Sequence, residues 1–297
     1  MVENPNRGIM LMVAATILFS LSDTLAKYLT GALPAVEIGW IRYVVFVLLA
    51  LSPLARPGHA SLRARRPWLQ VARGLAMAGS ALFFILGLSS LPMAEAATIS
   101  FASPLLITVL AVLFLGETVG LRGWLAVLAG FAGVLVVMRP GTGSFHFGAI
   151  YVIASALLWS VAIIVTRRMS GTERPTATLL WTAGTGLIVL SALLPFAFVP
   201  PGLHQLAIAA VLGVVASAGQ WLAILAYRHA GASVLAPLSY GQLIWSSSLG
   251  FLVFGTMPDL WTAVGAVFII GSGLYTIHRV RGRAAPLPAH AATPASS

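Results

Sequence analysis

The feature that most constrains this chain is a series of apolar stretches, each about the 20 residues that an α-helix needs to cross a bilayer. The stretches lie at residues 8–28, 34–54, 68–90, 96–115, 122–138, 148–167, 176–199, 203–226, 234–255 and 260–278. Hydrophobic residues make up 59% of the sequence and charged residues 8%, which excludes a soluble domain with an ordinary polar surface. The pattern predicts an all-α membrane protein with ten transmembrane helices.

The second feature is an internal repeat with a period of about 140 residues. Phe19-Ser20 returns as Trp159-Ser160, Ser100-Phe101 as Ser239-Tyr240, and Gly116 as Gly255. Each half contains five predicted spans, and an odd number of crossings brings the second half into the membrane upside down. Inverted repeats of this kind are a recurrent construction of secondary transporters. We therefore predict two inverted five-helix repeats, residues 8–138 and 148–278, that form a carrier.

The distribution of basic residues predicts the orientation in the membrane. Fourteen of the 17 Lys and Arg residues lie on the side that holds the N-terminus, whereas Lys27 and Arg139 lie opposite and Arg42 lies within the second span. Short loops rich in Lys and Arg stay in the cytoplasm, so we predict a multi-pass inner-membrane protein with both termini cytoplasmic. The net charge of +10 does not indicate nucleic-acid binding, because the basic residues are spread over helix ends rather than gathered on one face. The segment 279–297, rich in Pro, Ala and Ser, is predicted to be a disordered cytoplasmic tail.

The sequence lacks the common patterns of enzymes and metal sites. It has no cysteine, which excludes disulfides and thiolate metal sites. None of the six histidines belongs to an HExxH pattern, and neither a GxSxG nucleophile elbow nor a P-loop occurs. We therefore predict no catalytic residue, no metal, no cofactor and no enzyme activity. The expected partners are a small-molecule substrate and the lipid bilayer, with no obligate protein partner.

The candidate cavity residues are polar and aromatic side chains that share a helical face. On the first span Thr16, Ser20, Asp23 and Lys27 are separated by 4, 3 and 4 residues, the spacing that stacks side chains along one stripe. Lipid-facing positions need only be apolar, so the stripe predicts an inward face. By the same reasoning the predicted substrate-binding residues are Phe19, Ser20, Ser80, Phe84, Ser100, Trp159, Gln220, Tyr240, Gln242 and Trp245.

Two other interpretations of these residues stay open. Small polar residues also serve helix packing in membranes, because they let backbones approach and form hydrogen bonds between helices. Trp and Tyr also form belts at the membrane–water interfaces. The repeat favours a cavity for the aromatic residues, since Phe19 matches Trp159 in position and Phe101 matches Tyr240.

The candidate gating or coupling residues are Asp23, Lys27, Pro104 and Pro237. A charge inside a span is costly and needs a partner. Asp23 and Lys27 are four residues apart and are placed to pair, and Arg42 is placed to reach Glu37 or a neighbouring helix. A proline has no N–H to donate, so Pro104 and Pro237 each permit a bend. No series of buried carboxylates or histidines resembles a proton relay, which favours facilitated passage over proton-driven antiport.

Three motifs in the first half carry a resemblance to a known family. They are GLSSLPMAEAATISFASPL at 87–105, LGET at 115–118 and RPG at 139–141. With these motifs the chain resembles the EamA family of the drug/metabolite transporter superfamily, over about residues 8–278. The second half keeps Gly255 but has Thr256 where the first half has Glu117, so a role of that glutamate need not be duplicated.

The resemblance implies a ten-helix exporter of small metabolites that opens a central cavity alternately to either side. Within the family the chain is similar to exporters of aromatic and other amino acids, so the leading expectation is a broad-specificity amino-acid exporter. An exporter of S-adenosylmethionine or cationic drugs is the alternative, for which Asp23 is the candidate buried carboxylate. A non-transporting membrane sensor or a subunit of a membrane complex is the alternative from a different class.

Overall fold

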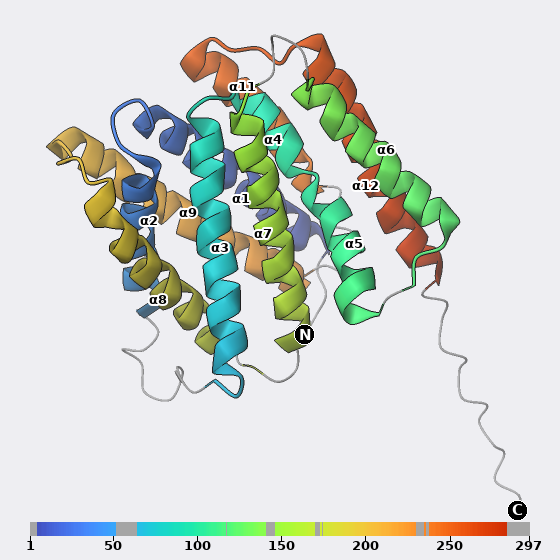
Figure 1. Cartoon of the computed structure of the whole chain (residues 1–297), viewed down its shortest axis with the longest axis horizontal. Coiled ribbons are helices and arrows are strands. Elements are labelled where there is room, and N and C mark those ends of the chain that lie inside the picture. The colour runs from blue at the N-terminus through green and yellow to red at the C-terminus, as the bar shows by residue number, and fades with distance from the viewer. Residues whose placement is uncertain are drawn as a thin grey trace, which may run out of the picture.

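The computed structural model describes residues 5–51, 64–116, 118–140, 146–169, 173, 175–229, 235 and 238–283 (Figure 1). Of residues 5, 175–176, 227–228 and 276–283 it describes the backbone alone. Every regular element within these residues is a helix. The helices are α1 (Pro5–Leu29), α2 (Ala35–Leu51), α3 (Pro67–Leu88), α4 (Met93–Ser100), α5 (Ser103–Leu115), α6 (Leu121–Met138), α7 (Gly148–Met169), α8 (Pro175–Leu193), the 3-10 helix η2 (Leu194–Phe196), α9 (Leu203–His229), α11 (Gly241–Phe254) and α12 (Leu260–Arg283).

Seven helical segments are long and apolar enough to cross a membrane, which confirms an all-α membrane architecture in the described residues. They are Asn6–Leu29, Pro67–Leu88, Met93–Leu115, Leu121–Met138, Gly148–Met169, Ala177–Phe196 and Leu203–Ala226. The predicted spans 34–54, 234–255 and 260–278 correspond to shorter described segments. Those segments are α2 with 17 residues, α11 with 14 residues, and the apolar part of α12, Leu260–Tyr275. The number of ten spans therefore stays a prediction.

The end of the chain differs from the expectation at the junction with the predicted tail. Helix α12 continues to Arg283, five residues into the segment 279–297. The rest of the predicted tail, residues 284–297, lies outside the described residues.

The fourth predicted span is interrupted at its proline. Helix α4 ends at Ser100, α5 begins at Ser103, and Pro104 is in the first turn of α5. Because Pro104 has no N–H, it donates no helical hydrogen bond to the carbonyl of Ser100, four residues before it. The break in regular helix thus lies directly before Pro104, where a bend was predicted, whereas Pro237 lies outside the described residues.

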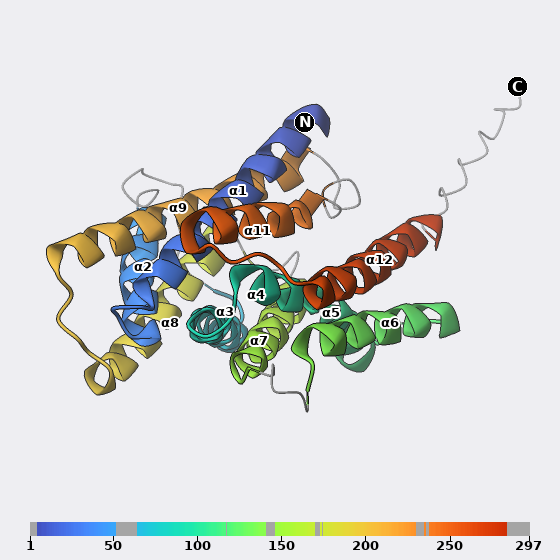
Figure 2. The ribbon, with the colours of Figure 1, turned by 90° about the horizontal axis from the view of Figure 1, so that it is seen from above.

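The helices pack in pairs that are far apart in the sequence. Helix α1 lies along α9, α3 along α7, and α6 along α12. Seen from above, α6 and α12 form a pair at one end of the molecule, while α2, α8 and α9 gather at the other end (Figure 2). Helices α1, α3, α4, α7 and α11 lie between these groups and include most of the predicted cavity residues.

Close helix contacts depend on glycine at the crossing of α3 and α7. A Cβ atom at Gly87 would overlap the side chain of Val152 and would lie 3.2 Å from the carbonyl oxygen of Gly148. A Cβ atom at Gly148 would likewise lie 3.2 Å from the carbonyl oxygen of Gly87. Small residues at such positions let two backbones approach in a membrane protein.

One end of this bundle contains the largest buried apolar cluster. We call it the outer end; it is where α1 ends at Leu29, α3 ends at Leu88 and α4 begins at Met93, and it is the predicted external side. All three residues belong to the cluster and are at most 1% exposed. The ends of α1, α3 and α4 are therefore held together by a continuous apolar core.

Candidate functional site

The polar stripe on α1 meets α11 within the membrane-spanning region. The hydroxyl of Ser20 donates to the carbonyl of Gln242 at 3.2 Å and lies 3.2 Å from the hydroxyl of Ser246. The side-chain amide of Gln242 donates to the carboxylate of Asp23 at 3.1 Å. Ser20 and Asp23 therefore share the face of α1 that contacts α11. We call Ser20, Asp23, Gln242 and Ser246 the polar crossing.

Lys27 continues the same stripe towards the outer end and binds backbone carbonyls. Its Nζ atom donates to the carbonyl oxygens of Leu88 at 2.9 Å and Leu91 at 2.6 Å, and lies 5.6 Å from the ring centroid of Phe254. The last carbonyls of a helix have no intrahelical donor and carry partial negative charge, so they attract a cation. Lys27 thus joins α1, α3 and α11 at the outer end. The ion pair of Lys27 with Asp23 that the sequence spacing allows is not formed in the described residues.

Arg42 forms no ion pair with Glu37 in the described residues. Glu37 is 1% exposed and its carboxylate accepts the N–H of Val199 at 3.1 Å. Of the two partners expected for Arg42, Glu37 is therefore not found, and a partner on a neighbouring helix stays a prediction.

One of the two matched aromatic pairs comes into contact. The ring centroids of Phe101 and Tyr240 are 4.9 Å apart at an interplanar angle of 41°. This pair joins the break between α4 and α5 to the start of α11. Phe19 instead packs against Gly219 of α9, and Trp159 is 37% exposed on α7. Within the described residues neither Phe19 nor Trp159 makes a ring contact with that pair.

The predicted serines of α3 and α4 make hydrogen bonds of the kind used in helix packing. The hydroxyl groups of Ser80 and Ser155 are 3.1 Å apart, and Ser155 also donates to the carbonyl of Ser80 at 2.8 Å. Ser100 donates to the carbonyl of Ala97, in its own helix, at 2.7 Å. These bonds satisfy the hydroxyl groups within the protein, so the packing interpretation accounts for Ser80 and Ser100 in this conformation.

The three other predicted cavity residues lie on three helices and are half-buried. Phe84 is on α3, Gln220 on α9 and Trp245 on α11. Phe84 packs against the apolar cluster of the outer end.

An ion cluster joins three helix ends at the outer end, and its partners were not identified from the sequence. Arg139 is paired with Asp259 and lies 3.8 Å from the carboxylate of Glu95. These residues come from the end of α6, the start of α12 and the first turn of α4. Asp259 also accepts hydrogen bonds from the backbone N–H of Thr262 at 2.8 Å and its hydroxyl at 2.7 Å, so it caps α12.

The charge state of Asp259 makes this cap sensitive to pH. Burial disfavours the charged carboxylate, but the hydrogen bonds from Thr262 and the charge of Arg139 outweigh it and lower the pKa below the ordinary 3.8. A depressed pKa adds stability above the unfolded-state value, and this stability is lost as the pH falls through the folded-state value. Replacement of Asp259 with Asn should therefore lower the melting temperature at neutral pH, with a cost below about 1 kcal/mol because the pair is partly exposed. The difference between the two melting temperatures in detergent should shrink as the pH falls below 3.8 and through the folded-state pKa of Asp259; a difference that does not shrink on acidification would contradict the ionic origin.

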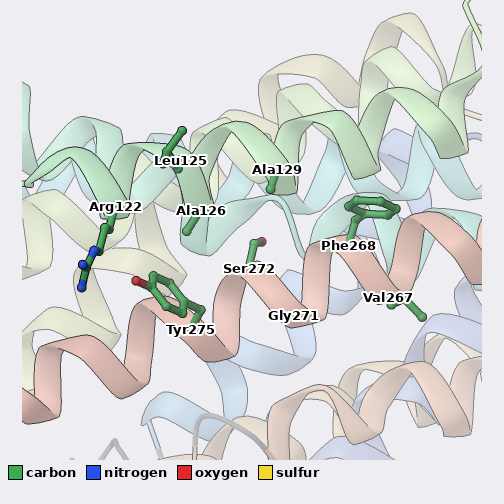
Figure 3. A pocket seen from close by; sticks show the side chains of 9 residues that line it. All are labelled: Arg122, Leu125, Ala126, Ala129, Val267, Phe268, Gly271, Ser272 and Tyr275. Carbon is green, nitrogen blue, oxygen red and sulfur yellow. The ribbon is translucent and has the colours of Figure 1, made fainter.

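A hollow of about 450 Å³ lies elsewhere, between α6 and α12. Its walls are mostly apolar, with Arg122 and Tyr275 at one end and Phe268 at the other (Figure 3). None of the predicted substrate-binding residues lines it. The candidate site is therefore the polar crossing with the adjoining Phe101–Tyr240 pair, rather than this hollow.

The family comparison gives two matches along this chain. The EamA-like transporter family matches residues 6–139 and again residues 146–277. The chain belongs to the EamA-like transporter family. The resemblance in the motifs at 87–105 and 115–118 is thereby confirmed, and the EamA chain is a multi-pass protein of the inner membrane like its bacterial relatives.

Several curated relatives cover most of this EamA chain. A riboflavin transporter of Rhizobium johnstonii is 30% identical over 275 residues, with 90% of each chain covered. An S-adenosylmethionine uptake transporter of Rickettsia prowazekii is 28% identical, with 91% of this chain and 92% of the relative covered. A pseudopaline exporter of Pseudomonas aeruginosa is 26% identical, with 89% and 93% covered. These relatives are transporters, which favours transport over an enzymatic role, and they include both uptake and export proteins.

A solved structure shares the fold of this EamA chain. A protein known by a crystal structure is similar with a TM-score of 0.63 at 23% identity, and 93% of this chain and 97% of that chain are covered. At this identity the likeness shows the fold alone. Amino acids are not named for these relatives, so the expected amino-acid substrate stays a prediction.

Proposed function

We propose that the protein is a secondary transporter that carries small metabolites bearing a planar ring, and that its two halves rock around a central cavity. The polar crossing of α1 and α11 carries this proposal. Ionisable residues within membrane spans are rare, and they commonly mark a substrate or ion pathway. In a chain of a transporter family, Asp23 with its Gln242 partner is therefore a reasonable centre for that pathway.

Equivalent hydrogen bonds in the two halves support the inverted repeat of residues 8–138 and 148–278. Ser20 donates to the carbonyl of Gln242, and Ser160 donates to the carbonyl of Ser103 at 3.1 Å. The two serines are 140 positions apart and the two acceptors 139 positions apart. Each half thus contributes one serine whose hydroxyl donates to a backbone carbonyl of the other half.

Helix ends and helix pairs support the same repeat. Gly116 and Gly255 both follow a helix in the left-handed conformation, with φ of 68° and 69°. In the repeat, α7 corresponds to α1 and α9 corresponds to α3. The packing of α1 against α9 therefore corresponds to the packing of α7 against α3. We propose ten spans on this basis, with both termini in the cytoplasm as the basic residues predict.

Aromatic side chains near the polar crossing support a substrate with a planar ring. Phe19, Phe101 and Trp245 are half-buried on α1, between α4 and α5, and on α11. Aromatic rings stack in offset or tilted arrangements that are worth about 0.5–1.5 kcal/mol beyond the area they bury. Aromatic amino acids, riboflavin and S-adenosylmethionine all contain a planar ring. The solutes expected from the sequence and the solutes named for two of the relatives therefore belong to one substrate class.

In this proposal the concentration gradient of the substrate sets the direction of transport. No series of membrane carboxylates for a proton relay is evident in the sequence, which favours facilitated passage. A facilitated carrier exports a metabolite that the cell makes and takes up one that is more concentrated outside. Lys27 at the outer end and Pro104 at the start of α5 are the proposed gating residues, and Pro237 is proposed because it lies at the start of the predicted ninth span.

Flux into liposomes tests the proposal. Purified protein is reconstituted and exposed to labelled tryptophan, phenylalanine, S-adenosylmethionine and riboflavin, with proline as a solute that lacks an aromatic ring. Saturable flux of at least one ring-bearing solute, well above that of proline and of protein-free liposomes, is the expected result. Absence of flux for all ring-bearing solutes would contradict the proposal and favour a sensor or a complex subunit.

A further inference from the structure

Helices α6 and α12 form a closely packed pair at one end of the molecule (Figure 2). A Cβ atom at Gly133 of α6 would lie 2.8 Å from the carbonyl oxygen of Gly265 of α12, and a Cβ atom at Gly265 would lie 2.6 Å from the carbonyl oxygen of Gly133. The two backbones are therefore in direct contact at this point. The contact lies toward the outer end, where α6 ends at Met138 and α12 begins at Leu260.

The hollow of about 450 Å³ lies along this pair, between the glycine contact and the start of α6. From Arg122 to Ala129 it follows seven residues of α6, or about 10 Å at 1.5 Å per residue. A Cβ atom at Gly271 in its wall would meet no heavy atom within 4 Å, so the space beside α12 is open there. Leu125 and Val267, also in the wall, are 55% and 72% exposed. The hollow therefore opens to the surroundings of the helix pair, which for a membrane-spanning pair are lipid.

The free polar groups of the hollow lie at one end, where Arg122 and Tyr275 face the same space (Figure 3). The hydroxyl of Ser272, further along the wall, donates to the carbonyl of Ile269 at 2.8 Å and is satisfied within α12. Arg122 is exposed, and in the described part of the chain it donates no hydrogen bond and forms no ion pair. It is the second residue of α6, at the end of that helix predicted to face the cytoplasm. An unpaired cation thus lies at the membrane-surface end of an apolar hollow.

We propose that this hollow binds an anionic phospholipid of the cytoplasmic leaflet, with the phosphate group at Arg122 and an acyl chain along the apolar walls. A guanidinium binds phosphate through parallel charge-assisted N–H bonds, and the hydroxyl of Tyr275 is a further donor at the same end. Basic pockets between transmembrane helices on the cytoplasmic side bind anionic lipid headgroups. A zwitterionic lipid with the same chains has no net charge, so Arg122 should distinguish the two.

The lipid site is separate from the proposed substrate pathway. None of the residues of the polar crossing lines the hollow, so loss of lipid binding leaves the proposed function standing, and absence of solute flux leaves the lipid site standing. An arginine that served only to orient the helices would keep α6 the right way up without selecting among lipids. Selection by lipid charge is therefore the property to measure.

Binding of added lipid to the purified protein in detergent tests the proposal. Native mass spectrometry counts the lipids that stay bound to the full chain. The two probes are dioleoylphosphatidylglycerol, which is anionic, and dioleoylphosphatidylcholine, which has the same chains and is zwitterionic. We expect the anionic lipid to bind about 10-fold more tightly, the effect of one hydrogen-bonded charge. Equal affinity for the two lipids, or binding of neither, would overturn the proposal.

A first pair of variants tests the headgroup end. Arg122→Gln should weaken binding of the anionic lipid about 10-fold and leave the zwitterionic lipid unchanged, and Arg122→Lys should restore part of the loss. Arg65→Gln is the matched control, because Arg65 is an exposed arginine before α3, on the same predicted side and outside the hollow. The control should change neither affinity. Equal losses in the Arg122→Gln and Arg65→Gln variants would show that overall charge, not this site, selects the lipid and would contradict the assignment.

A second pair of variants tests the acyl-chain end. Gly271→Leu places a side chain in the open space of the hollow and should weaken both lipids about 10-fold, the equivalent of about two methylene groups that are no longer buried. Gly184→Leu of α8, where a Cβ atom also meets no heavy atom within 4 Å, is the control and should bind both lipids as the wild type does. Ala129→Leu fills the hollow from α6 and is the second test of the same point. Unchanged affinity in both filling variants would overturn the placement of the chain.

Discussion

Replacement of Gly87 with valine is expected to prevent α3 and α7 from packing. A Cβ atom there would overlap Val152, which is 0% exposed, and would lie 3.2 Å from the carbonyl oxygen of Gly148. Neither a buried side chain nor a backbone carbonyl can move without shifting its helix. Overpacking of a close-packed contact costs about 1–3 kcal/mol and occasionally more, and this site, with a buried side chain and a backbone carbonyl in the way, should lie at the upper end. We expect little monodisperse protein after detergent extraction, measured by size-exclusion chromatography of a fluorescent fusion.

The chain offers a matched control for this substitution. Gly184 also lies within a helix, α8, and a Cβ atom there would meet no heavy atom within 4 Å. Gly184→Val should therefore give a monodisperse yield close to that of the wild type. Equal yields of the two variants would contradict the close packing of α3 against α7.

Replacement of Lys27 with methionine is expected to open the outer end. The substitution removes the two hydrogen bonds to the carbonyls of Leu88 and Leu91 and the contact with the ring of Phe254. Hydrogen bonds to a charged group contribute about 1.5–3 kcal/mol each. Loss of about 3 kcal/mol from the closed state raises the open population about 100-fold. Transport should change as well, because a closed outer state is one of the two states of the proposed cycle.

Labelling of a single cysteine measures this opening. The chain contains no cysteine, so Thr24→Cys introduces a unique thiol at a position that is 4% exposed, one turn below Lys27. We expect a membrane-impermeant maleimide added outside intact cells to label this thiol about 10- to 100-fold faster with Lys27→Met than without it. Tyr28→Met, which changes a neighbouring residue that is 51% exposed, is the control. The same labelling rate in both variants would show that Lys27 does not hold the outer end closed.

The helical architecture was predictable because its signals are local. Apolar length identifies a span, and Pro104 identifies the break between α4 and α5 because a missing N–H acts on its own helix. The spacing of Ser20 and Asp23 correctly predicted a common face for the same reason. The extension of α12 to Arg283 was not predicted, since the composition of residues 279–297 resembles a disordered tail.

The partners of the site residues were harder to predict because they depend on how helices lie side by side. Lys27 binds backbone carbonyls, which every residue has, so the sequence carries no mark of its partner. Glu37 accepts the N–H of Val199 rather than pairing with Arg42, because α2 lies beside the segment that follows α8. Ser80 fits a cavity and a helix contact equally well by residue type, and only its 3.1 Å distance to Ser155 distinguishes them. The repeat indicated a contact between separate helices in one case. It matched Phe101 with Tyr240, and the rings of these two residues are in contact.

Exchange across the membrane of liposomes tests most directly whether the protein is a carrier that alternates between two sides. Liposomes are loaded with a labelled ring-bearing solute that the protein transports, and efflux is followed with and without the unlabelled solute outside. If the carrier changes conformation faster with solute bound than without it, external solute should accelerate efflux several-fold. This acceleration should saturate as the external concentration rises. Efflux that is unaffected by external solute at every concentration would indicate a simple pore and contradict alternating access.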